Sequence, residues 1–93
     1  MKQLIIIYEL LSSNLNEKTL FENMIRKYDN YAFLSNNACI IWTDTTPVNV
    51  RDYLLQGLRN KDKIFVSEIS APAAWNNISK EVSEYIIKYL IEN

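Results

Sequence analysis

The spacing of the apolar residues changes along the chain, and these changes predict where strands and helices lie. Four short segments are rich in β-branched and aromatic residues, a composition typical of β-strands. We predict strands over residues 2–10, 31–34, 38–43 and 63–70. In the first and third segments apolar residues occupy consecutive positions, which indicates strands that are buried on both faces and lie inside a sheet.

Three other segments carry apolar residues at the three- and four-residue spacing of a helix that buries one face. The first helix is expected to begin with Asn16 as its N-cap. The second is expected to begin at Thr46-Pro47, a capping hydroxyl followed by a proline, and to end near Asn60. Ser79 is expected to cap the third. The expected buried positions are Leu20, Phe21, Met24, Ile25 and Tyr28 in the first helix, Val50, Tyr53, Leu54 and Leu58 in the second, and Val82, Tyr85, Ile86, Tyr89 and Leu90 in the third.

The order of these elements predicts a fold. It is strand, helix, strand, strand, helix, strand, helix, with Asn36-Asn37 as the turn of the central hairpin. Two split β-α-β units joined by a hairpin predict an α+β, ferredoxin-like two-layer sandwich with an extra C-terminal helix. We therefore expect a single domain over residues 1–93 and an antiparallel sheet with the strand order 4-1-3-2, in which the two fully apolar strands are interior.

The second face of the predicted sheet is apolar, and this predicts how the protein assembles. The first two helices cover one face of such a sandwich, while both interior strands are apolar on both faces. The other face must be covered by the C-terminal helix, by a second subunit or by both. On this ground we expect a homodimer.

The composition excludes several kinds of chemistry and localisation. The chain has no histidine, which excludes Ser-His-Asp triads and histidine metal sites. Cys39 is the single cysteine, so it cannot form an internal disulfide, which favours a reducing, cytoplasmic compartment. Ten basic and eleven acidic residues give a net charge of −1, which argues against coating of nucleic acid. The first apolar run stops at Glu9, short of the roughly 20 residues of a membrane span, so we expect no membrane partner.

Several segments of the chain resemble a known group of small proteins. They are Ile7-Tyr8-Glu9-Leu10, Val50-Arg51-Asp52-Tyr53-Leu54, residues 62–69, Ala74-Trp75 and Ser83-Glu84-Tyr85-Ile86. With these segments the chain resembles the ferredoxin-like proteins related to the CRISPR-associated adaptation subunit "Cas two", in particular the branch called SinR-like. The resemblance covers nearly the whole chain and implies a homodimer.

The resemblance makes Glu9 the first candidate site residue. In the nuclease-active relatives an aspartate follows the tyrosine of the first strand, and two copies of it hold a divalent metal across the homodimer. Glu9 stands at that position, which implies an Mg²⁺ or Mn²⁺ site and a metal-dependent endonuclease acting on RNA or DNA. The alternative interpretation is an ion pair of Glu9 with Lys61 or Lys63, because the end of the first strand lies beside the start of the fourth in the predicted order.

Other residues are candidates for binding. Arg59, Lys61 and Lys63 are basic and could contact the phosphates of a nucleic acid. Asp44 and Glu68, at the ends of the third and fourth strands, could form a second acidic site with Asp52, although we favour solvated strand ends. The alternating aromatic residues Tyr31 and Phe33 are expected to pack under the helices or in a dimer interface, because the glycine and basic companions of an RNA-recognition sheet are missing.

Three functions follow from the sequence. The preferred one is a non-enzymatic homodimeric binding module, related to the CRISPR adaptation subunit and acting through protein or nucleic acid, with no firm cofactor. The second is the metal-dependent nuclease that would use paired Glu9. The third is a toxin, an antitoxin or a phage-encoded inhibitor whose partner is another protein.

Overall fold

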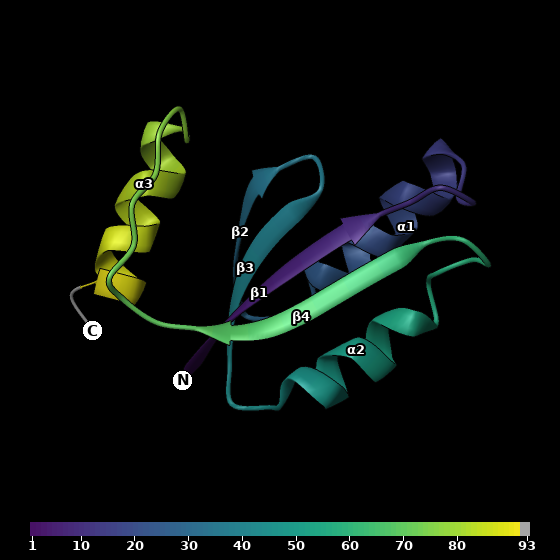
Figure 1. Ribbon diagram of the computed structural model, residues 1–93, viewed down its shortest axis with the longest axis horizontal. Helices are drawn as coiled ribbons and strands as arrows, with labels where there is room; N and C mark the ends of the chain where they lie inside the picture. The colour runs from purple at the N-terminus through teal and green to yellow at the C-terminus, as the bar shows by residue number, and fades with distance from the viewer. Residues whose placement is uncertain (92–93) are drawn as a thin grey trace.

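The computed structural model describes residues 1–91, and its strands and helices follow one another in the predicted order (Figure 1). The elements are β1 (Lys2–Glu9), α1 (Leu15–Ile25), β2 (Asn30–Ser35), β3 (Ala38–Thr43), α2 (Pro47–Leu55), β4 (Lys63–Ile69), α3 (Lys80–Ile86) and a π-helical turn, η1 (Ile87–Ile91). The result is a mixed α+β fold with one four-stranded sheet.

The strands of the sheet lie in the order β2-β3-β1-β4, and every neighbouring pair is antiparallel. Counted from the β4 edge, this order is β4-β1-β3-β2. The two strands expected inside the sheet, β1 and β3, are therefore its interior strands. Ile5, for example, lies between Ile40 of β3 and Ser67 of β4.

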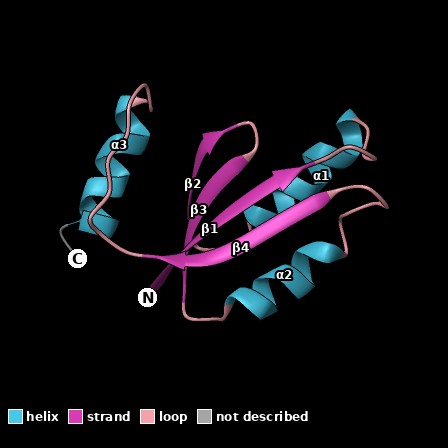
Figure 2. Ribbon diagram, in the orientation of Figure 1, coloured by secondary structure: helices cyan, strands magenta, loops and turns pink. Residues whose placement is uncertain are grey.

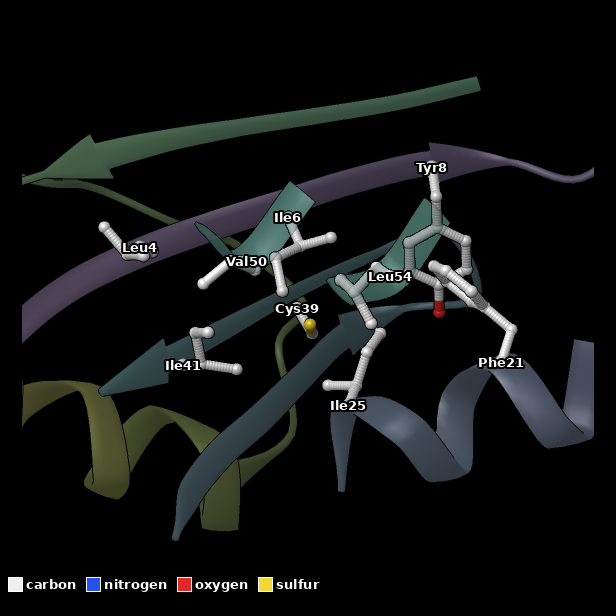
Figure 3. Close-up of a cluster of buried hydrophobic side chains, with 9 residues drawn as sticks. All are labelled: Leu4, Ile6, Tyr8, Phe21, Ile25, Cys39, Ile41, Val50 and Leu54. Atoms are coloured by element: carbon white, nitrogen blue, oxygen red, sulfur yellow. The ribbon is translucent and has the colours of Figure 1, made fainter. Parts of the chain in front are cut away.

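One face of the sheet packs against α1 and α2, as Figure 2 shows. Alternate residues of β1 and β3 point into this layer and meet residues of both helices (Figure 3). The buried cluster comprises Leu4, Ile6, Tyr8, Phe21, Ile25, Cys39, Ile41, Val50 and Leu54. Since almost all of these side chains are apolar and well buried, this layer is the main source of hydrophobic stabilisation.

The opposite face of the sheet is covered by α3 and η1 over part of its area. The aromatic ring of Trp42 packs against Tyr85 and Tyr89, with ring centroids 5.1 Å and 5.6 Å away. The buried residues of this second cluster are Ala32, Ile40, Trp42, Ile86 and Leu90. Beyond it, the neighbouring residues Ile7 and Phe65 keep 46% and 60% of their surface exposed, so this face is only partly covered.

The start of α1 differs from the sequence expectation. The N-cap is Asn14 and not Asn16, because the Asn14 side chain accepts a hydrogen bond from the Glu17 backbone while the Glu17 carboxylate accepts one from the Asn14 N–H. This reciprocal arrangement satisfies two backbone N–H groups at the start of the helix. The expected burial of Leu20 is also wrong, since 64% of this residue is exposed.

The end of α2 differs as well. The helix ends at Leu55, earlier than the expected Asn60, and Leu58 packs on the core from the loop that follows. At this end the N–H groups of Gly57 and Leu58 bond to the carbonyls of Leu54 and Leu55, three residues back, so the α-helical pattern stops there. Gly57 has no Cβ, which leaves room for the Met24 sulfur of α1.

Replacing a core residue of α2 should be far more damaging than the same change at the exposed position of α1. We expect Leu54→Ala to lower the free energy of unfolding by about 2–5 kcal/mol, because Leu54 is fully buried. Leu20→Ala is the matched control and should change it by less than about 0.5 kcal/mol. Urea denaturation of both variants measures the difference, and equal losses would contradict the observed burial.

Candidate functional site

Glu9 lies at the end of β1, directly opposite Lys63 at the start of β4. Its carboxylate oxygen is 3.9 Å from the Lys63 ammonium nitrogen, and the two side chains are 54% and 73% exposed. An exposed ion pair of this geometry contributes at most about 1 kcal/mol. The pair borders a shallow depression of about 300 Å³ that is also lined by Ile7, Tyr8, Asn37, Ile64 and Phe65.

The other two basic candidates lie near Glu9 but have different surroundings. The Arg59 guanidinium donates a 2.6 Å hydrogen bond to the Glu17 carboxylate, which ties it to the first turn of α1. The backbone N–H of Lys61 donates to the Ser12 hydroxyl, while its own side chain is exposed. Arg59, Lys61 and Lys63 thus share one end of the sheet, where two of the three basic groups already face a carboxylate.

A junction around Asp62 is the most connected polar group at this end, and sequence reasoning missed it. Its carboxylate accepts hydrogen bonds from the Ser13 hydroxyl and from the backbone N–H groups of Ser12 and Arg59. Partial burial raises the Asp62 pKa, but these hydrogen bonds outweigh it and hold the pKa below the ordinary value. The junction fastens the β1–α1 loop to the α2–β4 loop.

The sequence does hold a signal for this junction. Ser12, Ser13 and Asn14 form one cluster of turn-forming residues, and Asn60 and Asp62 belong to another. Side chains of these types bond readily to nearby backbone groups, which marks both segments as structured turns. What the sequence does not show is that the two clusters, about fifty positions apart, meet in space.

The acidic candidates at the opposite end of the sheet are not gathered into a site. Asp44 lies 3.7 Å from the N-terminal amino group and is 88% exposed. Asp52 pairs with its neighbour Arg51 on α2, and Glu68 lies opposite Leu4 in the sheet. Within residues 1–91, no group of three or more histidine, cysteine, aspartate and glutamate side chains is arranged to hold a metal ion.

Two buried titratable groups belong to the core and not to a site. Burial raises the pKa of Cys39 to about 12, so its thiol stays protonated and poorly reactive. Burial and a 2.7 Å hydrogen bond donated to the Glu22 carboxylate raise the pKa of Tyr8. Both groups stay neutral at physiological pH.

A larger groove lies at the opposite edge of the sheet, between β2 and α3. It has a volume of about 420 Å³ and is lined by Asp29, Tyr31, Ala32, Phe33, Glu81, Val82 and Tyr85. Tyr31 and Phe33 are half-buried against the α1–α2 layer, so the expectation that they pack under the helices is met in part. Sequence reasoning did not associate these two residues with Glu81 and Tyr85 of the last helix.

Comparison with known proteins adds no assignment. A scan against protein-family models finds no match, and a search of curated proteins finds no significant relative. None of the helices within residues 1–91 is both long and apolar enough to cross a membrane.

Removing the carboxylate at the loop junction should destabilise the protein. We expect Asp62→Ala to lower the free energy of unfolding by about 1–3 kcal/mol, because three hydrogen-bond donors lose their acceptor. Asp52→Ala is the matched control, since it removes an exposed partner of Arg51 and should cost less than about 1 kcal/mol. Thermal denaturation of both variants measures the two losses of stability. Equal losses would show that the junction does not stabilise the fold.

The same junction should make the free energy of unfolding depend on pH in the acidic range. The pKa of Asp62 is lower in the folded protein than its ordinary 3.8, so its contribution is complete above that value and is lost as the pH falls through the folded pKa. We expect the stability difference between wild type and Asp62→Ala to shrink as the pH falls below about 4. Urea denaturation of both proteins at neutral and acidic pH measures this difference. A difference that stays constant with pH would refute the lowered pKa of Asp62.

Proposed function

We propose that this chain is a non-enzymatic binding module that works as a homodimer and recognises a protein partner. The observation that carries the proposal is the exposed apolar surface beside β4. Phe65 and Ile7 are 60% and 46% exposed on the sheet, and Val48 and Leu55 of α2 are 53% and 48% exposed. We call these four residues the β4-side surface.

Two residues of the β4-side surface, Phe65 and Val48, flank an open strand edge. β4 pairs with β1 on one side and forms an edge of the sheet on the other. A groove of about 220 Å³ runs along this edge, lined by Pro47, Val48, Arg51, Ile64, Phe65 and Val66. An unpaired edge flanked by apolar side chains favours pairing with another chain.

A second copy of the chain suits this edge. An antiparallel strand pair can be symmetric, so β4 of one copy can pair with β4 of another around a two-fold axis. Each copy then offers the same apolar residues to the other, as an isologous interface requires. The pairing would cover Phe65, which α3 leaves exposed on the second face of the sheet.

The proposed fold family is ferredoxin-like, and the proposed relatives are the SinR-like branch of the CRISPR adaptation subunit group. The element order and the interior position of β1 and β3 support the fold. A protein partner is favoured over nucleic acid because Arg59 and Lys63 already face carboxylates and the net charge is −1. Glu9, adjacent to Lys63, is assigned to that ion pair in this proposal.

A charge placed on the β4-side surface should separate the two copies. We expect Phe65→Glu to weaken dimerisation at least about tenfold, because a buried carboxylate at the centre of the interface would be unpaired. Leu20→Glu is the matched control, since Leu20 is 64% exposed on α1, away from the β4 edge. Sedimentation equilibrium measures both variants, and circular dichroism checks that each is folded.

The proposal of a homodimer fails if the wild-type chain is monomeric at all accessible concentrations. It also fails in its present form if Leu20→Glu dissociates the dimer and Phe65→Glu does not. In that case the two copies would meet through α1 instead of β4.

A further inference from the structure

We infer that the groove between β2 and α3 binds an extended basic peptide segment of a partner protein, which adds to the sheet at the β2 edge. The inference rests on the proposed binding function and names the class of partner. It concerns a different edge of the sheet from the dimer surface. The groove lies at β2, whereas the proposed dimer uses β4 at the other edge, so the two proposals can be tested separately.

The floor of the groove is a free strand edge. β2 pairs with β3 on one side and is the outermost strand on the other. Residues from both faces of β2 line the groove, since Tyr31 and Phe33 belong to the α1–α2 layer and Ala32 to the α3 layer. A groove with this arrangement presents the backbone edge between two walls, as peptide recognition by strand addition requires.

The walls of the groove are aromatic and acidic. Tyr31 and Phe33 form one wall, with their rings 5.8 Å apart, and Val82 and Tyr85 of α3 contribute to the other. Asp29 and Glu81 also line it, and neither takes part in an ion pair with the residues of 1–91. The two carboxylates favour a cationic occupant and disfavour nucleic acid.

One basic side chain of the protein already shows how the wall holds a cation. The Arg26 guanidinium carbon lies 4.8 Å from the centre of the Phe33 ring. The same guanidinium donates a hydrogen bond to the Asn23 side chain, and so is held by its own helix. The groove lining itself holds two carboxylates and no basic side chain.

The groove is held open before any partner binds. The Tyr85 hydroxyl donates a 2.7 Å hydrogen bond to the Asn30 side chain, which fixes α3 to the first residue of β2. The Tyr85 ring also packs against Trp42 and Tyr89, with centroids 5.1 Å and 4.6 Å away. Pre-ordered walls reduce the conformational entropy that a bound peptide would otherwise have to offset.

The test uses a capped, fluorescein-labelled nine-residue peptide in which valine and lysine alternate. Fluorescence anisotropy should show saturable binding to the wild-type chain. The double variant Asp29→Asn, Glu81→Gln should bind about fivefold to tenfold more weakly, as expected for two lost surface charge interactions. The matched control is Asp52→Asn, Glu84→Gln, which removes the same charge from exposed positions outside the groove and should bind like wild type.

Two further probes test the mode of binding. A peptide N-methylated at alternate positions along one edge should lose most of its affinity, because strand addition needs its N–H groups. Amide chemical shifts of the wild-type chain should change on peptide addition at the residues that line the groove on β2 and α3, which are Tyr31, Ala32, Phe33, Glu81, Val82 and Tyr85. The inference is overturned if the lysine peptide does not bind, if the two double variants bind equally, or if the shifts lie elsewhere.

The same measurements on Phe65→Glu separate this inference from the proposed dimer. If Phe65→Glu is monomeric and still binds the peptide, the inference about the groove is supported independently of the dimer proposal. If the wild-type chain forms a stable dimer but does not bind the peptide, the inference about the groove is overturned and the dimer proposal is unaffected. Binding of the glutamate counterpart of the peptide at equal strength would show that charge does not select the occupant.

Discussion

Two interior strands with apolar side chains on both faces are the constraint on which the rest of the structure depends. Alternate residues of β1 and β3 point to opposite sides of the sheet, so each side must exclude water. α1 and α2 bury the side chains of β1 and β3 on one side. On the other side, α3 and η1 cover the part of the sheet near Trp42 and leave Ile7 and Phe65 exposed. The incomplete cover leaves apolar side chains of the sheet in contact with water, and the proposed dimer rests on this exposure.

The two edges of the sheet differ in the side chains that flank them. β4 is bordered by Val48 and Phe65, whereas β2 is bordered by aromatic rings and the carboxylates Asp29 and Glu81. An exposed edge offers similar backbone donors and acceptors wherever it lies, so the flanking side chains decide what can pair with it. This difference is why we assign a second copy to one edge and a basic peptide to the other.

The charged residues near Glu9 are largely satisfied within the chain. Arg59 bonds to Glu17, Lys63 lies opposite Glu9, and the Asp62 carboxylate joins two loops through Ser12, Ser13 and Arg59. A carboxylate that accepts several hydrogen bonds holds a loop in one geometry and lowers its own pKa at the same time. These contacts fasten the β1–α1 loop to the α2–β4 loop at this end of the sheet.

The sequence by itself determined the element types, the interior strands and the buried stripe of the last helix, because periodicity and β-branched content are local properties of the chain. It placed the α1 cap at Asn16 and the end of α2 near Asn60 wrongly, since the capping box of Asn14 and Glu17 fixes the first boundary and the shift to three-residue hydrogen bonds after Leu55 fixes the second. Only the tertiary structure decided how much of the second face α3 covers. Only it brought Glu81 and Tyr85 beside Tyr31 and Phe33, because residues about fifty positions apart meet through the path of the folded chain and not through any local pattern.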